Sequence, residues 1–290
     1  MRYPLVSCVT VAGLLLLQTG CSNVRKGILQ GTDHGSMAAV FEPQARAEIV
    51  PLQTVDGTEI AALFGRALSP TGQRLMDYSR RPTVMYFYAG GHTLQRSEPV
   101  FDAWRRLGVN VIVPEYPGYG LSRGKATERG CYAAADAVYR YLVERSDIDT
   151  KKILAAGWSV GGSVAVNLAS RESLAGLILL ATSTRTADVA RIRSKGSKST
   201  AWMPGWAISA LTAQAKLDSL AKIPAVTCPI LMINGENDDL VLREMADRLA
   251  AAAPGRVQRH VVPGVGHGDL IRPDDTELWN TLRVWVKSLD

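Results

Sequence analysis

Short apolar runs alternate along the chain with longer stretches in which apolar residues recur near helical spacing. The runs have the length of buried strands and cover residues 83–88, 110–114, 152–154, 174–181 and 229–234, with a further strand at 257–262. The helical patterns cover residues 99–107, 127–145, 163–170, 242–253 and 274–289. Strands that alternate with helices predict an α/β fold, with a mostly parallel twisted sheet and helices on both faces.

The first two predicted strands form a different pattern. Residues 48–55 and 59–68 flank the dipeptide Asp56-Gly57, which is a strong signal for a tight hairpin turn. An antiparallel hairpin is therefore expected at the start of the sheet. In the parallel part, ligands are expected to bind at the carboxyl ends of the strands.

The N-terminal segment indicates export. Arg2 carries a positive charge, and residues 5–17 are mostly apolar. That run is too short to cross a bilayer, which takes about 20 residues, but it suits the core of a signal peptide at residues 1–20. The following residues 21–47 are polar and rich in glycine, as in a flexible tether.

The sequence Leu17-Gln18-Thr-Gly-Cys21 resembles the lipobox of bacterial lipoproteins, in which the cysteine is lipidated and becomes the mature N-terminus. Gln18 departs from the aliphatic residue usual there. An ordinary cleaved signal and an uncleaved anchor are the alternatives. Ser22 is not the Asp that often retains such proteins in the inner membrane. The resemblance thus implies secretion across the inner membrane and a lipid anchor in the outer membrane, facing the periplasm.

The remaining residues 48–290 fit a single α/β domain. Besides Cys8 and Cys21 in the targeting region, only Cys131 and Cys228 remain, so this is not a disulfide scaffold, and whether those two pair is open. The net charge of +6 is spread over the chain without a basic stripe interleaved with aromatics, which argues against nucleic-acid binding. The sequence implies no metal or cofactor, and it leaves the oligomeric state open.

The candidate chemistry centres on Gly157-Trp-Ser159-Val-Gly161, which lies between a predicted strand and a predicted helix. Strand, tight turn and helix with a serine in the turn are the setting of a nucleophile elbow. The backbone turn exposes the Ser159 hydroxyl, and the flanking glycines leave room for it. Ser159 is therefore the candidate nucleophile, and a plain turn is the alternative.

A serine hydroxyl needs a base held in one tautomer by a third group. Of the four histidines, His34 lies in the tether and His260 lies within a strand. His267 lies in a glycine-rich loop after the last strand, where the chain order Ser, Asp, His places the base. His92 follows a glycine pair after a strand, and His267 is therefore the candidate base.

The acid is expected in the loop after residues 229–234. Asp238 and Asp239 are adjacent there, and only one can point at the histidine. The other would cap the following helix. For the oxyanion hole, the N–H of Val160 follows the nucleophile, and a second backbone N–H is expected from Gly91, with His92 in reserve.

The chain resembles the α/β-hydrolase superfamily over residues 48–289, and most of all its Bem46-like serine hydrolases. The loop Val-Pro-Glu-Tyr-Pro-Gly-Tyr-Gly-Leu-Ser at residues 113–122 is similar to the family's Tyr-Arg-Gly-Tyr-Gly-x-Ser loop. The family's Gly-x-x-Asp pattern maps to Asp238, and its Gly-x-Gly-His-Gly-Asp pattern maps to His267. Pro117 replaces the usual Arg, and residues 89–91 replace the family's His-Gly-Asn.

Residues 182–227 form an insertion long enough for a short lid. They combine a basic run with the apolar residues Trp202, Met203, Pro204, Trp206 and Ile208. Such a lid would shape an acyl pocket over Ser159. Equally, these apolar residues can simply pack on the sheet.

The sequence therefore predicts a lipid-anchored serine hydrolase that cleaves a carboxylic ester or thioester of a small acyl or amphiphilic substrate through an acyl-enzyme. A serine peptidase of the same fold is one alternative, because the same triad cleaves amides. A lipoprotein that keeps the fold as a binding module is the other. Three triad side chains together argue against that last alternative, because binding alone needs none of them.

The lipobox leads to a prediction about Cys21. Two or more acyl chains anchor a protein stably, at about 0.8 kcal/mol per buried CH₂. We expect Cys21→Ser to move the protein out of the membrane fraction or to stall it uncleaved, while the isolated domain stays active on soluble esters. Intact-mass analysis of the membrane-extracted protein is the measurement. A free, unlipidated N-terminus at another residue would contradict the lipoprotein interpretation.

Overall fold

The computed structural model describes residues 47–196, 203–205, 207, 212 and 215–289. The predicted signal peptide, the lipidation site Cys21 and almost all of the tether lie outside the described residues, as do His34, Trp202, Trp206 and Ile208. In the part of the chain that is described, no helix combines the length and the apolar character needed to cross a membrane.

The described residues build one eight-stranded sheet in the order β1-β2-β4-β3-β5-β6-β7-β8. Its strands are β1 (Glu48–Gln53), β2 (Glu59–Gly65), β3 (Thr83–Phe87), β4 (Asn110–Pro114), β5 (Ile153–Trp158), β6 (Gly176–Leu180), β7 (Ile230–Gly235) and β8 (Val257–Val262). From β4 onward through the sheet all neighbours are parallel, whereas β2 is antiparallel to both β1 and β4. The expected mostly parallel sheet is confirmed.

The N-terminal hairpin forms where the turn signal places it. Gly57 adopts a φ of 80°, which is favourable for glycine. The Thr54 hydroxyl donates to the Asp56 carboxylate at 2.6 Å, and the Thr58 hydroxyl does so at 3.0 Å. These hydrogen bonds lower the pKa of Asp56. The turn is thus held by its own short polar side chains.

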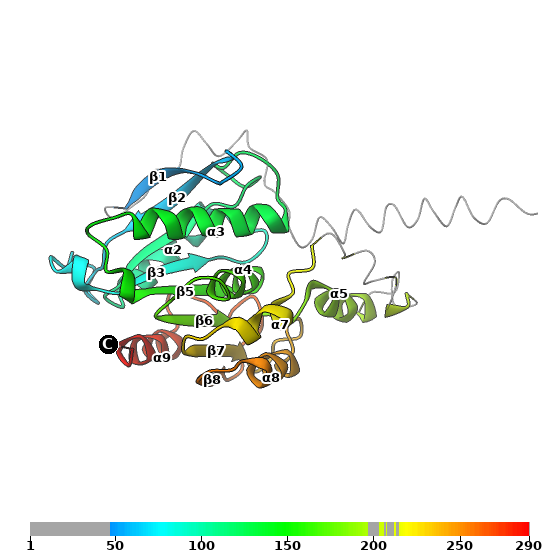
Figure 1. Cartoon of the computed structure of the whole chain (residues 1–290). Coiled ribbons are helices and arrows are strands. Elements are labelled where there is room, and N and C mark those ends of the chain that lie inside the picture. The colour runs from blue at the N-terminus through cyan, green and yellow to red at the C-terminus, as the bar shows by residue number, and fades with distance from the viewer. Residues whose placement is uncertain (1–46, 197–202, 206, 208–211, 213–214, 290) are drawn as a thin grey trace, which may run out of the picture.

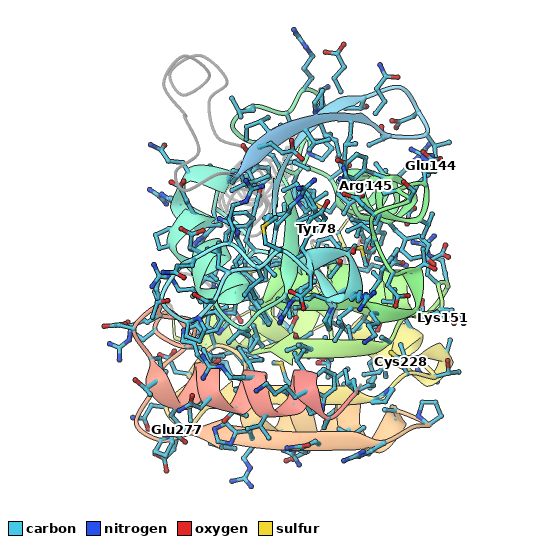
Figure 2. All side chains as sticks on the ribbon, turned by 90° about the vertical axis from the view of Figure 1, so that its left-hand side faces the viewer. Tyr78, Glu144, Arg145, Lys151, Cys228 and Glu277 are labelled. Atoms are coloured by element: carbon cyan, nitrogen blue, oxygen red, sulfur yellow. The ribbon has the colours of Figure 1, made fainter. Side chains whose placement is uncertain are left out.

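Helices cover the two faces of the sheet (Figures 1 and 2). The main ones are α2 (Leu94–Arg105), α3 (Glu128–Val143), α4 (Val160–Ala169), α5 (Thr186–Lys195), α7 (Ser219–Lys222), α8 (Arg243–Ala252) and α9 (Thr276–Lys287), with short 3₁₀ helices at Tyr78–Arg80, Thr150–Lys152 and Ile223–Ala225. Helices α3, α4, α7 and α8 lie side by side on one face (Figure 1). Helices α2 and α9 share the other, where the Trp104 and Trp279 rings meet edge to face at 5.4 Å.

The central strands are buried along their whole length, because helices cover both faces. Strand β5 pairs with β3 on one side and β6 on the other. The residue after β5 therefore lies in the middle of the sheet, at its carboxyl edge. The amino-terminal ends of the strands face the viewer in Figure 2, where the labelled residues Tyr78, Lys151 and Cys228 lie shortly before β3, β5 and β7.

The start of α2 differs from the sequence expectation, and the structure answers whether Cys131 and Cys228 pair. Helix α2 begins at Leu94 rather than at residue 99, because the Thr93 hydroxyl caps it by accepting the Arg96 N–H at 3.4 Å. Cys131 and Cys228 are both buried free thiols, so they do not pair. Burial raises the pKa of Cys131 to about 12 and that of Cys228 to about 11.

Candidate active site

Ser159 occupies a sharp turn between β5 and α4. Its φ of 55° and ψ of −116° are uncommon for a residue with a side chain. The turn requires close backbone contacts. A Cβ at position 161 would lie 1.9 Å from the Phe87 carbonyl oxygen, and one at position 157 would lie 2.1 Å from the Gly161 carbonyl oxygen. Only glycine fits at both positions, which explains their presence on either side of Ser159.

His267 reaches Ser159 from the loop after β8. Its Nε2 lies 3.1 Å from Ser159 Oγ, and its Nδ1 lies 2.8 Å from Asp238 Oδ2. When Nδ1–H donates to the carboxylate, the Nε2 lone pair faces the serine hydroxyl. That is the tautomer a general base needs.

Asp238 is held in place by its second oxygen. Oδ1 accepts the N–H groups of Leu240 at 3.0 Å and Val241 at 2.7 Å. The side chain is only 1% exposed. Both carboxylate oxygens are thus engaged, one by the loop backbone and one by His267, so the carboxylate has little freedom to turn away.

The acid loop and the histidine loop are fastened together by backbone contacts. The Asn237 N–H donates to the Val265 carbonyl at 2.9 Å, and the Gly264 N–H donates to the Glu236 carboxylate at 2.8 Å. A Cβ at position 235 would lie 2.2 Å from the Val265 carbonyl oxygen, so glycine allows the two loops to touch. These contacts set the distance between Asp238 and His267.

Asp239 is placed differently from its neighbour. Its side chain is exposed, and helix α8 begins after Leu242 without any side-chain cap. The expectation that it caps the helix is therefore wrong. The turn before α8 is closed by Asp238, which already accepts the two amides of that turn.

The remaining described histidines do not join the Ser–His–Asp chain. The His92 ring meets the Trp158 ring edge to face at 5.0 Å, and burial, aided by the nearby Arg96, lowers the pKa of His92. His260 lies on β8, where its Nε2 is 3.3 Å from a Glu277 carboxylate oxygen.

One of the two expected oxyanion donors has a suitable position. Val160 is the first residue of α4, so its N–H is one of the amides at a helix start that have no acceptor within the helix. The positive end of the helix dipole also lies there. Val160 lines the pocket together with Ser159.

Gly91 is less directly placed. It has a φ of 80°, and its N–H lies near the Tyr119 phenol, where it opposes the rise that burial causes in the pKa of that group. The Tyr119 hydroxyl has no hydrogen-bond partner among the described residues. The approach of the Gly91 N–H to that hydroxyl therefore does not amount to a hydrogen bond. Gly90, rather than Gly91, lines the pocket. The Gly91 assignment stays a prediction, and Gly90 is a second candidate from the same turn.

A cavity of about 230 Å³ opens beside Ser159 and His267. Its further lining residues come from the turn after β3, from the elbow, from α5 and from the loops beyond it: Ala89, Gly90, His92, Trp158, Val160, Ser183, Thr186, Val189, Arg193, Leu217, Leu240 and Gly268. Three of them lie on α5, which belongs to the 182–227 insertion. The described part of that insertion therefore borders the candidate site, and its role as a lid stays a prediction.

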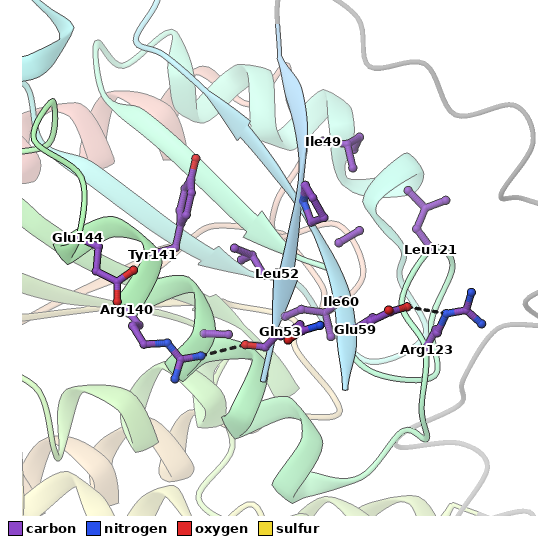
Figure 3. Close-up of a pocket in the computed structure, with 13 residues that line it drawn as sticks. Ile49, Leu52, Gln53, Glu59, Ile60, Leu121, Arg123, Arg140, Tyr141 and Glu144 are labelled. Carbon is purple, nitrogen blue, oxygen red and sulfur yellow. Dashed lines mark hydrogen bonds and ion pairs between the residues drawn. The ribbon is translucent and has the colours of Figure 1, made fainter. Parts of the chain in front are cut away.

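A larger hollow of about 840 Å³ lies elsewhere, over β1, β2 and α3 (Figure 3). None of its lining residues lines the Ser159 cavity. Three of its charged groups already have partners, since Arg123 pairs with Glu59 at 2.7 Å and Arg140 donates to the Gln53 carbonyl at 2.9 Å. In the described part of the chain, no three His, Cys, Asp or Glu side chains cluster to hold a metal ion. The Ser159 cavity is therefore the candidate active site.

Comparison with known proteins agrees with this architecture. The sequence model of the alpha/beta hydrolase family matches residues 92–277. The chain belongs to the alpha/beta hydrolase family.

The chain is 36% identical to an uncharacterized Mycobacterium tuberculosis protein over 166 residues, which are 56% of this chain and 54% of the relative. It is 32% identical to the alpha/beta hydrolase domain-containing protein aho-3 of Caenorhabditis elegans over 164 residues, which are 57% of this chain and 45% of the relative. The chain spans about half the length of the curated relatives that it matches.

Solved structures show the same fold. An esterase of Pyrococcus furiosus superposes with a TM-score of 0.69 at 18% identity, covering 90% of this chain and 98% of the esterase. A thermophilic esterase of Thermogutta terrifontis superposes with a TM-score of 0.59 at 22% identity, covering 84% of this chain and 99% of that one. At these identities the likeness establishes the fold.

The sequence analysis missed one buried acidic residue beside the site. Glu115 follows β4 directly and is 1% exposed. The available signal was an acidic residue directly after the apolar run at residues 111–114.

The geometry leads to a matched pair of variants. We expect Asp238→Asn to lower kcat by roughly 10⁴-fold, because the amide no longer holds His267 in the tautomer that accepts a proton. The exposed neighbour is the control, and Asp239→Asn should stay within about twofold of wild type. Esterase assays and thermal melts of both variants make the comparison. The reverse order of activity would transfer the acid role to Asp239.

Proposed function

We propose that this alpha/beta hydrolase is a serine hydrolase that cleaves a carboxylic ester or thioester through an acyl-enzyme. One observation carries the proposal, namely the continuous chain of hydrogen bonds from Ser159 through His267 to Asp238, with distances of 3.1 and 2.8 Å. Family membership and esterases among the structural neighbours support a hydrolase. Resemblance to the Bem46-like group supports an acyl or lipid-like substrate.

In the first half of the proposed reaction, Ser159 Oγ attacks the carbonyl carbon while His267 Nε2 takes its proton. The negative charge that develops on the carbonyl oxygen is stabilised by backbone N–H groups, one from Val160 and one from the turn at residues 89–92. His267 then gives the proton to the leaving alcohol or thiol, and the acyl group remains on Ser159.

In the second half, His267 takes a proton from water, and the resulting hydroxide attacks the acyl carbonyl. The same backbone donors stabilise the second tetrahedral intermediate. Its collapse returns the proton to Ser159 and releases the carboxylic acid. Asp238 keeps His267 in one orientation through both halves.

The cavity supports a preference within the ester class. Val189, Leu217 and Leu240 provide an apolar wall, and Trp158 adds an aromatic one. Its volume of about 230 Å³ is below the roughly 300 Å³ at which pockets for drug-sized ligands begin. We therefore infer that an acyl chain of short to medium length fits beside Ser159.

A serine peptidase of the same fold is the second candidate, since the proposed steps apply to an amide as well.

We also propose that the enzyme works on the periplasmic side of the outer membrane, held by lipid on Cys21. This proposal is supported by the lipobox resemblance alone. It would bring the domain to amphiphilic substrates at the bilayer surface.

The nucleophile assignment has a direct test. We expect Ser159→Ala to abolish labelling by a fluorophosphonate probe and to lower esterase turnover by about 10⁴-fold or more, while the melting temperature stays close to that of wild type. Ser183, which also lines the cavity, provides the control, and Ser183→Ala should keep both labelling and turnover. Residual turnover within tenfold of wild type in Ser159→Ala would mean another nucleophile. A wild-type enzyme that the probe never labels would favour the binding-module alternative.

The substrate class is tested with p-nitrophenyl esters of increasing acyl length. We expect kcat/KM to rise from acetyl to an acyl chain of about four to six carbons and to fall for chains of about twelve, because the cavity is small. Val189→Trp should reduce activity on the longer esters more than on the acetyl ester. Activity that keeps rising to the longest chains would contradict the size preference, and faster cleavage of matched anilides would favour the peptidase.

A further inference from the structure

Glu115 is a buried carboxylate that takes no part in the steps proposed above. It lies at the carboxyl end of β4, one strand away from β3 and two from β5, and it is 1% exposed. Burial raises its pKa, and hydrogen bonds from the Leu94 N–H, the Leu121 N–H and the Tyr88 hydroxyl act in the opposite direction. Burial of an ionisable group costs free energy, and hydrogen bonds to the carboxylate offset part of that cost.

One oxygen of Glu115 holds both ends of the turn that follows β3. Oε1 accepts the Leu94 N–H at 2.9 Å and the Tyr88 hydroxyl at 3.1 Å. Tyr88 comes just before the turn, and Leu94 is the first residue of α2 just after it. The segment between them, residues 89–93, contains Gly90 and Gly91, the two candidates for the second oxyanion donor, whereas the N–H of the reserve His92 already donates to the Ala89 carbonyl at 3.2 Å. The carboxylate therefore bridges the two ends of the segment that must be placed correctly against the substrate.

Tyr116 extends the same network to the main chain directly after β3. Its N–H donates to the Tyr88 hydroxyl oxygen at 3.1 Å, and its own hydroxyl donates to the Tyr88 carbonyl at 3.3 Å. The Tyr88 carbonyl packs against the start of α4, where a Cβ at position 161 would lie 2.7 Å from its oxygen. A shift of Tyr88 would thus change the position of the turn relative to Ser159.

The other oxygen of Glu115 is fixed by its own loop. Oε2 accepts the Leu121 N–H at 3.2 Å, and a Cβ at Gly120 would come within 2.3 Å of it. The Ser122 hydroxyl donates to the Glu115 carbonyl at 2.7 Å. The carboxylate is consequently anchored on one side and holds the turn after β3 with the other.

We propose that Glu115 is a positioning residue, whose carboxylate holds residues 89–93 at the distance from Ser159 that oxyanion stabilisation requires. The inference rests on the proposed serine hydrolase function. It assigns to Glu115 no contact with the substrate. Its effect acts through the backbone donor of that turn, so it should appear in the transition state and not in substrate binding.

Glu115→Gln is the most informative change, because it keeps the shape of the side chain. The amide has one oxygen and one NH₂ group, so it cannot accept both the Leu94 and the Leu121 N–H. We expect kcat to fall by about 10- to 100-fold with KM within threefold of wild type, somewhat less than the loss of a whole oxyanion donor. The inhibition constant of a trifluoromethyl ketone, which forms a tetrahedral oxyanion on the serine, should rise by the factor by which kcat/KM falls.

Asn110 provides the matched control, since it lies at the other end of the same strand. It is fully buried, accepts the Ala67 N–H at 3.0 Å and donates to the Tyr78 carbonyl at 2.9 Å. Asn110→Ala should lower the melting temperature yet keep kcat, per folded molecule, within about twofold of wild type. Equal losses of kcat per folded molecule in the two variants would show that Glu115 serves stability alone and would overturn the proposal.

Tyr116→Phe provides an independent variant should Glu115→Gln fail to fold. It removes only the hydroxyl that bonds the Tyr88 carbonyl, and we expect a fall of kcat of about three- to tenfold with unchanged KM. Near-UV circular dichroism reports the folded state of each protein. Full kcat in the folded Tyr116→Phe protein, or in folded Glu115→Gln, overturns the positioning role while Ser159→Ala still defines the nucleophile. A wild-type enzyme without esterase activity would overturn both proposals.

Discussion

The structure depends on one close approach, between the start of α4 and the carboxyl end of β3. A side chain at position 161 would clash with the Phe87 and Tyr88 carbonyl oxygens, and a side chain at position 157 would clash with the backbone of Gly161. This contact forces Ser159 into its unusual backbone conformation, with a φ of 55°. Because β5 lies between β3 and β6 in the centre of the sheet, the packing of these buried strands holds Ser159 in that strained conformation.

The other groups of the site reach Ser159 along the same edge of the sheet. Asp238 follows β7 and His267 follows β8, so parallel strands deliver both to the end at which Ser159 lies. The two loops are then joined by their own backbone bonds and by a glycine contact at Gly235. Ser159, His267 and Asp238 are thus positioned by strand ends, which suits the proposed reaction, because that reaction depends on preorganised groups.

The turn after β3 follows a different principle. It carries a glycine pair, so its backbone is intrinsically permissive, and its placement depends on side chains from elsewhere. The buried group of Tyr88, Glu115 and Tyr116 supplies that constraint. In this chain the candidate nucleophile Ser159 is therefore fixed by steric exclusion, and the turn proposed to stabilise the oxyanion is fixed by polar contacts. The cavity beside Ser159 and this turn is bordered by α5.

The sequence by itself determined the α/β class, the N-terminal hairpin and the tight turn at Ser159, and it singled out His267 as the candidate base, because each follows from local periodicity, turn residues and chain order. The residues alone left Asp238 and Asp239 open, and only a family resemblance favoured Asp238. The tertiary structure buries Asp238 against His267 and leaves Asp239 exposed.

Tertiary structure alone decided what depends on residues distant in the chain. It left Cys131 and Cys228 unpaired, and it started α2 at a threonine cap before Pro99. It also gave Glu115 its partners, since Leu94 lies 21 residues away in sequence and Tyr88 lies 27. Burial and hydrogen-bond partners follow from how strands and helices pack, and no periodicity along the chain encodes which distant backbone N–H a carboxylate will meet.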